Sequence, residues 1–177
     1  KGIKYGLAGV VGLALVGGLL IAALPAWLVW APDGGLQPLQ GLYGGELSQL
    51  IRGALTSGAR WRLAGVTLLP VTFALVALWQ LWALFGAYLQ GDVFGPRPVA
   101  CLRRFGWAMV ALAVAEPLSR PLASVAITLD NAPGHRLLVV TLGTHDYALL
   151  MCALVFVAIA RVMSEAARLA EENQQFV

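Results

Sequence analysis

Charged residues are scarce in this sequence: Asp, Glu, Lys and Arg make up only 12% of the 177 residues, while 59% are apolar. A soluble domain is typically about a quarter charged and about half apolar, so that polar groups cover its surface. The mean hydropathy of +0.78 points the same way. We therefore interpret the chain as an all-α, polytopic membrane protein.

Cysteine and histidine are also scarce, with two residues of each. Cys101 and Cys152 fall near opposite ends of different apolar segments, and neither belongs to a CxxC pair, which argues against a disulfide scaffold. His135 and His145 share one loop without zinc-ligand spacing. The sequence also lacks a phosphate-binding glycine loop, a nucleophile elbow and an HExxH motif. We expect no enzyme activity, no metal and no cofactor.

Four apolar segments are long enough, or nearly so, to cross a hydrocarbon core as helices, which needs roughly 20 residues. They predict one membrane domain over residues 1–177, with four transmembrane helices at 5–30, 64–88, 105–129 and 146–163. The segments between them are two outer loops, an inner loop and a tail, at 31–63, 130–145, 89–104 and 164–177. We expect the inner loop to be a tight connection, because Pro96 and Pro98 cannot continue the second helix.

The distribution of basic residues predicts the orientation, because Lys and Arg are retained on the cytoplasmic side. One side holds seven basic residues and the other four; these are Lys1, Lys4, Arg97, Arg103, Arg104, Arg161 and Arg168 against Arg52, Arg60, Arg62 and Arg136. Both termini should therefore be cytoplasmic. The net charge of +3 is then a topology signal, and we expect no direct contact with nucleic acid.

The first apolar segment has a basic start, but it is too long for a signal peptide and lacks a small residue at position 24 for a cut near Ala26. We interpret it as an uncleaved span. It is rich in glycine, including Gly12 spaced four residues from Ala8, and such spacing lets helix backbones approach closely. This packing is internal, or it forms a homo-oligomer or a larger membrane complex; we favour internal packing.

Three features lie outside the spans. Apolar residues at helical spacing within 47–55 predict a short outer amphipathic helix, which either lies in the membrane interface or covers the bundle as a lid, the interpretation we favour. Residues 127–142 are compatible with a small outer β-hairpin and equally with an irregular loop. Alternating charges after Arg161 predict that the fourth helix extends into the cytoplasm.

The third span carries the polar residues that stand out most. Glu116 and Arg120 are four residues apart and share a helix face, so we expect them to form an ion pair. Ionisable residues inside a membrane helix are costly unless paired or hydrated, which makes them candidates for function. Around them, Pro117, Ser119 and Pro121 predict a kinked or opened helix. A self-compensated structural kink and a ligand or ion site both fit these residues.

Proline also occurs in the outer half of two other spans, at Pro25 and Pro70. Three helices would then be interrupted at the same level as Pro117. Irregular backbone at membrane depth is tolerated where it is buried in protein or lines a watered cavity. The pattern predicts a vestibule that opens outward and ends at Glu116 and Arg120.

The chain resembles a bacterial membrane family catalogued as domain of unknown function 2975. The resemblance rests on three segments in order: Gly91 to Phe94 followed by Arg103 to Gly106, then Glu116 to Leu118, and then Ala160 to Val177. It implies a small inner-membrane protein with four spans. It also implies a cytoplasmic helix-turn-helix regulator as a partner, which would contact a surface made of Arg103, Arg104, Glu165, Arg168, Glu171 and Glu172.

These observations together favour a non-enzymatic sensor or regulatory partner in the bacterial inner membrane. Two other functions stay open. A small transporter or channel-like protein would use Glu116 and Arg120 to line a path, and an accessory subunit would dock into a larger membrane assembly through its first span.

Overall fold

The computed structural model describes residues 2–30, 55–91, 95–131, 136 and 138–174. These residues form four helices: α1 (Gly2–Trp30), α4 (Ser57–Leu89), α5 (Pro96–Thr128) and α6 (Thr144–Gln174). No strand occurs among the described residues. The predicted all-α class is therefore confirmed.

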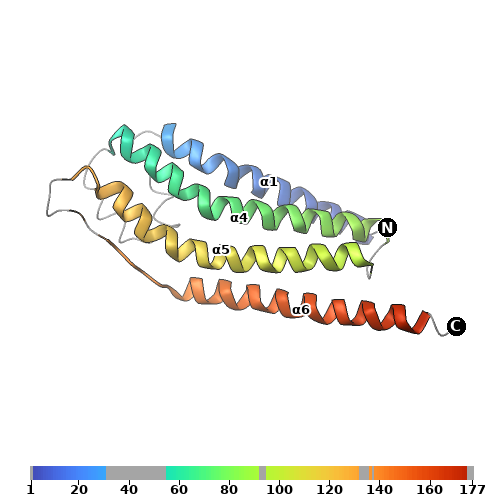
Figure 1. The fold of residues 1–177 in the computed structure, drawn as a ribbon. Coiled ribbons are helices and arrows are strands. Elements are labelled where there is room, and N and C mark those ends of the chain that lie inside the picture. Colours follow the sequence, from blue (N-terminus) through green and yellow to red (C-terminus); the bar gives the residue numbers. More distant parts are fainter. Residues whose placement is uncertain (1, 31–54, 92–94, 132–135, 137, 175–177) are drawn as a thin grey trace.

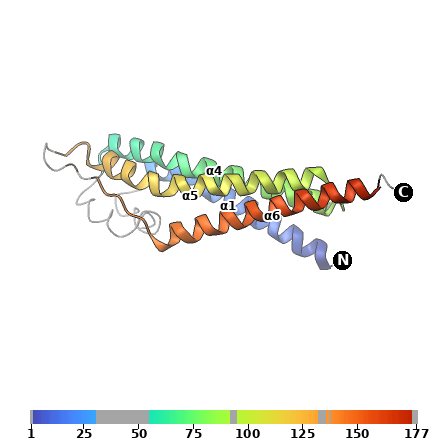
Figure 2. The same cartoon turned by 60° about the horizontal axis from the view of Figure 1, so that its bottom comes forward.

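The helices run up and down along one common axis, and both chain termini lie at the same end of the molecule (Figures 1 and 2). Each helix packs mainly on its neighbour in the chain, with α1 on α4, α4 on α5 and α5 on α6. The last turns of α6 project beyond the ends of α4 and α5 in both views. The arrangement leaves α1 and α6 with extensive unpacked surface.

Three of these helices are long and apolar enough to cross a membrane: Ser57–Leu89, Pro96–Thr128 and Thr144–Leu169. In α1 the apolar stretch Ala14–Trp30 is shorter. Large apolar side chains are exposed on all four helices, among them Leu19, Trp79, Leu118 and Val155. Exposed apolar surface on this scale fits lipid contact, and the chain is a membrane protein.

Helices α4 and α5 start earlier than predicted, at Ser57 and Pro96 instead of residues 64 and 105. Pro96 is the first residue of α5 and Pro98 lies in its first turn, so residues 96–104 are helical and the expected inner loop is shorter. The physical reason is that the first turn of a helix has no internal acceptor for its N–H groups, so proline costs little there. At the other end of the molecule, Thr56 caps α4 by accepting a hydrogen bond from the Ala59 N–H at 3.2 Å.

The core consists of two layers of small and medium side chains between the helices. Near the loop between α5 and α6, Leu28 of α1 packs with Leu63 and Ala64 of α4 and with Ala123 and Ile127 of α5. Toward the termini, a second cluster joins α4, α5 and α6; it contains Ala77, Leu84, Cys101, Leu102, Phe105, Ala108 and Ala160. Only the second cluster includes a residue of α6.

The helices α5 and α6 approach each other closely at Gly106. A Cβ atom at that position would lie 3.0 Å from Val157 Cγ2, 3.1 Å from its backbone N and 3.3 Å from its Cα. On α6, Ala153 and Ala160 are buried on either side of this point. Small residues thus bring the two helices together, as is common in membrane bundles.

The loop predictions have mixed outcomes. The amphipathic helix at 47–55 lies almost wholly outside the described residues. Residues 138–143 are described and contain no strand, so the β-hairpin is not confirmed. In α1, a Cβ atom at Gly18 would lie 3.6 Å from Leu78 Cδ1 of α4, whereas Cβ atoms at Gly9, Gly12 and Gly17 would meet nothing within 4 Å. Internal packing through Gly12 is therefore not confirmed.

An exposed ion pair ties α4 to the C-terminal end of α5. Arg62 Nη2 donates to Asp130 Oδ2 at 2.6 Å, and the Thr56 hydroxyl donates to the same oxygen at 2.5 Å. The hydrogen bond from Arg62, followed by that from Thr56, holds the pKa of Asp130 below its ordinary value of 3.8. The pair therefore stabilises the fold only while Asp130 is ionised.

This shift predicts a defined pH dependence. Because the folded pKa of Asp130 is lowered, its contribution is fully present above 3.8 and is lost as the pH falls through the folded value. We expect Asp130→Asn to lower the melting temperature modestly at neutral pH and to flatten its fall on acidification. Melting curves from neutral to strongly acidic pH test this; identical acid limbs for the two proteins would contradict it.

Candidate functional site

The proline-containing stretch of α5 forms an unbroken helix. The helix continues through Pro117 and Pro121, and α1 and α4 likewise continue through Pro25 and Pro70. The predicted interruption of three helices is therefore wrong. Ser119 donates to the Glu116 carbonyl at 2.7 Å and Ser124 to that of Pro121 at 2.8 Å, so each hydroxyl bonds about one turn back along its own helix. The carbonyls that Pro117 and Pro121 deprive of an N–H donor are those of Ala113 and Pro117, four residues earlier.

Arg120 binds Asp146 rather than Glu116. Its Nη1 donates to Asp146 Oδ2 at 2.6 Å and its Nη2 to Oδ1 at 2.7 Å, which is a bidentate pair. The two side chains are only 12% and 7% exposed. The predicted pairing of Glu116 with Arg120 is thus wrong, because a fork of two donors fits the buried carboxylate at the start of α6.

Asp146 has a second structural task. It lies in the first turn of α6, where its Oδ2 accepts a hydrogen bond from the Gly143 N–H at 2.7 Å. This contact resembles the acidic half of a capping box, and a negative charge also suits the positive end of the helix dipole. One carboxylate therefore begins α6 and fixes that helix to α5.

The loop segment before α6 lies against α5. Arg120 Nη1 also donates to the Thr141 carbonyl at 3.0 Å, and the Val139 N–H donates to the Ser124 hydroxyl at 3.0 Å. Ser124 is fully buried. These contacts extend the polar site of α5 along the helix. They depend on residues for which the sequence left a hairpin and an irregular loop equally open.

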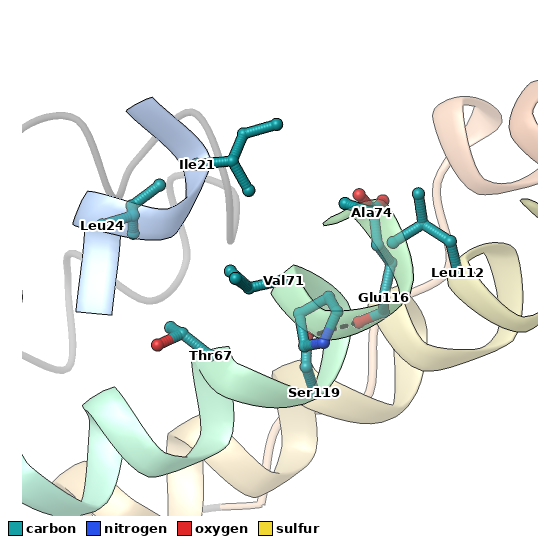
Figure 3. A pocket seen from close by; sticks show the side chains of 9 residues that line it. Ile21, Leu24, Thr67, Val71, Ala74, Leu112, Glu116 and Ser119 are labelled. Carbon is teal, nitrogen blue, oxygen red and sulfur yellow. Dashed lines mark hydrogen bonds between the residues drawn. The ribbon is translucent and has the colours of Figure 1, made fainter. Parts of the chain in front are cut away.

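A cavity of about 230 Å³ lies between α1, α4 and α5. Figure 3 shows Ile21 and Leu24 of α1 across from Val71 of α4, with Glu116 and Ser119 of α5 on the other wall. Other lining residues are Thr67, Pro70, Ala74 and Leu112. The cavity contains Pro70 and Glu116, as predicted for a vestibule, but Arg120 does not line it.

Glu116 carries the charge of this cavity. Its carboxylate lies 3.6 Å from His145 Nε2, an ion pair only while the histidine is protonated. The Glu116 side chain is 28% exposed and that of His145 is 74% exposed. Arg120 and Asp146 neutralise each other. When His145 is neutral, none of the described residues therefore gives the Glu116 carboxylate an opposite charge. The cavity, whose other lining residues are uncharged, then presents one negative group.

The residues of the predicted cytoplasmic surface lie at the end of the molecule that carries the termini. Arg103 and Arg104 are exposed on α5, and Glu165 and Arg168 are exposed on α6, where they form an ion pair at 3.1 Å. A shallow pocket brings Arg103 and Arg168 together. Glu171 and Glu172 belong to α6, but their side chains lie outside the described set.

Within the described parts of the chain, no three His, Cys, Asp or Glu side chains come together in a way that could hold a metal ion. Cys101 is buried in the core and Cys152 is exposed; neither is in a disulfide. The prediction that the protein needs no cofactor stays a prediction.

Residues 52–177 match the family described as "Protein of unknown function (DUF2975)". The chain belongs to this family. The match confirms the resemblance and contains all three segments that carried it. We expected the resemblance to cover essentially the whole chain, but the match begins after α1. For this DUF2975 protein, no curated protein and no solved structure gives a match.

Proposed function

We propose that this protein is a non-enzymatic sensor in the bacterial inner membrane, with the cavity between α1, α4 and α5 as its ligand site. The observation that carries the proposal is Glu116, an acidic residue in an apolar cavity within a helix long enough to span the bilayer. Intramembrane ionisable residues usually mark functional sites. In this proposal α1 is the fourth span and both termini are cytoplasmic.

The chemistry of the cavity favours an apolar molecule with one positive charge. Its lining is mostly aliphatic, with Ile21, Leu24 and Val71 among the lining residues, and its acidic group is Glu116. A ligand ammonium group would become the partner of this carboxylate, with a charge-assisted hydrogen bond worth about 1.5–3 kcal/mol. A cavity of about 230 Å³ suits a small organic cation.

The structure offers a route by which binding could change the cytoplasmic side. Glu116 borders the cavity and also lies beside His145 at the start of α6. A bound cation competes with protonated His145 for the carboxylate, and α6 is one continuous helix from there to Gln174. A small displacement at its start would therefore reach Glu165 and Arg168. The proposal therefore requires that α6 has two states, and that ligand binding and partner binding each favour one of them.

The partner at that end is proposed from the family resemblance, as a cytoplasmic helix-turn-helix regulator. The exposed Arg103, Arg104, Glu165 and Arg168, extended by Glu171 and Glu172, form the proposed contact surface. Reversing the charges of Glu171 and Glu172 should abolish co-purification with such a regulator. A native pull-down with mass spectrometry tests this directly, and retention of the same partner by the charge-reversed protein would contradict it.

Ligand binding is tested with a primary alkylammonium ion, which is positively charged at neutral pH and carries N–H donors for the Glu116 carboxylate. We expect this probe to bind the purified protein in nanodiscs, and Glu116→Gln to weaken its affinity by about tenfold or more, which is the loss of one charge-assisted contact. A neutral probe of similar shape should bind both proteins equally. Asp130→Asn, which removes an acid far from the cavity, serves as the control.

Two results would overturn the ligand assignment. Equal affinity of Glu116→Gln and the unmodified protein for the cation would show that the carboxylate plays no part. Movement of the cation across liposomes at a rate that depends on Glu116 would favour the transporter alternative instead. Binding measured by calorimetry and flux measured on the same preparation separate these outcomes.

A further inference from the structure

A second recess lies between the first turns of α5 and the last part of α6, at the end of the molecule that carries the termini. Its volume is about 270 Å³, and its lining includes Val99, Ala100 and Arg103 from α5 and Ser164, Ala167 and Arg168 from α6. The two helices are in close contact at Gly106 and Val157. Beyond that point, Ala100 and Ala167 leave space between them that larger side chains would fill.

The described side chains around this recess are mostly basic. Among the side chains described at this end, Arg97, Arg103, Arg104, Arg161 and Arg168 are exposed, and the acidic residue is Glu165. Glu165 bonds to Arg168 on its own helix, at 3.1 Å. The positive charge of Arg103 faces the recess from the other helix, and Ser164 adds a hydroxyl donor beside it. A negatively charged group is the chemistry that this lining favours.

The recess also lies at a level where lipid headgroups are found. Arg103 is about 25 Å from Arg120 along α5, close to the thickness of a hydrocarbon core of about 30 Å. Apart from Arg104 and Glu116, the stretch between them is mostly apolar, and it exposes Trp107, Val114 and Leu118. Trp107 lies one turn from Arg103, where an interfacial tryptophan is expected. An acyl chain could follow this exposed surface from a headgroup held at Arg103.

We propose that the recess binds the phosphodiester group of an anionic phospholipid. Arg103 holds the phosphate oxygens with its planar fork of donors, and Ser164 donates a further hydrogen bond. Arg168, which is paired with Glu165, lines the recess from α6. Basic pockets between transmembrane helices are recognised sites for acidic lipid headgroups. The recess is separate from the cavity at Glu116, but it shares Arg103 and Arg168 with the proposed regulator surface.

The test compares two arginine variants that change the net charge equally. In a neutral detergent, we expect phosphatidylglycerol to bind more tightly than phosphatidylcholine, as counted by native mass spectrometry and seen as a larger rise in melting temperature. Arg103→Gln should reduce the phosphatidylglycerol affinity by about tenfold. Arg97→Gln, on an exposed residue that does not line the recess, should change it less than about twofold, because it alters only the long-range field. Arg103→Lys should have an intermediate effect, since it keeps the charge and loses the fork.

Three results would overturn this assignment. Equal losses in Arg103→Gln and Arg97→Gln would show that lipid responds to overall charge and that the recess is no site. Equal binding of phosphatidylglycerol and phosphatidylcholine would exclude recognition of an anionic lipid. The same rise in melting temperature with inorganic phosphate alone would identify a soluble phosphate, and not a lipid, as the ligand. Because Arg103 is exposed, circular dichroism should show all three variants folded.

Discussion

Replacement of Asp146 by asparagine is expected to lower the free energy of unfolding by about 3–5 kcal/mol, the usual cost of removing one partner from a buried ion pair. The Arg120 guanidinium would remain buried at 12% exposure with its bidentate acceptor weakened. The change also weakens the cap on the Gly143 N–H at the start of α6. Equilibrium unfolding in mixed detergent micelles measures the loss.

Asp130→Asn is the matched control, because Asp130 also pairs with an arginine through a hydrogen bond of 2.6 Å. That pair is 34% and 40% exposed, so solvent screens it and its removal should matter far less. The double replacement Arg120→Met with Asp146→Leu should recover much of the stability lost in Asp146→Asn. If both asparagine variants lower the free energy of unfolding equally, burial of the Arg120–Asp146 pair does not contribute to stability.

Substitution of Gly106 by leucine is expected to separate α5 from α6 and to cost about 1–3 kcal/mol or more, as overpacked interfaces do. Even the Cβ atom would lie 3.1 Å and 3.3 Å from backbone atoms of Val157, which no side-chain rotation can relieve. The measurement is the melting temperature of the purified protein, together with disulfide trapping between cysteines introduced in α5 and α6.

Gly65→Ala provides the control for Gly106, since a Cβ atom at Gly65 of α4 meets nothing within 4 Å. Helix propensity alone predicts that this change is neutral or stabilising by up to about 1 kcal/mol. If Gly106→Leu leaves both the melting temperature and the trapping yield unchanged, the close approach of α5 and α6 is not a feature of the folded protein.

The sequence identified the important polar residues but not their partners. Glu116 and Arg120 stood out because ionisable groups are rare in membrane spans, and the structure places both at polar contacts. Helical spacing predicted that they bind each other, yet Arg120 binds a residue 26 positions away. Local periodicity describes neighbours on one helix, whereas the partner of Arg120 depends on how α6 returns to α5. No pattern of residues along a single helix specifies how α6 packs on α5.

The helix boundaries show a similar limit. Pro96 and Pro98 predicted a rigid loop, because proline breaks the interior of a helix, but the same residue is favoured in the first turn. Each of the four predicted apolar segments falls on a helix, and three of these helices are long and apolar enough to cross a membrane. Segment length and composition carry that information directly. The cavity at Glu116 was predicted from aligned prolines for the wrong reason: the helices stay intact, and the space lies between them.

The packing order of the helices has a consequence for how the protein is made. Among the described helices, the main contacts of each are with its neighbours in the chain, so each later helix packs on the one synthesised just before it. As the chain emerges, every new segment can therefore dock on a partner already in the bilayer, and no long-range search is needed before the next one inserts. Such neighbour-by-neighbour contacts are the kind that fold quickly. The ion pair between Asp146 at the start of α6 and Arg120 of α5 belongs to the last of these contacts.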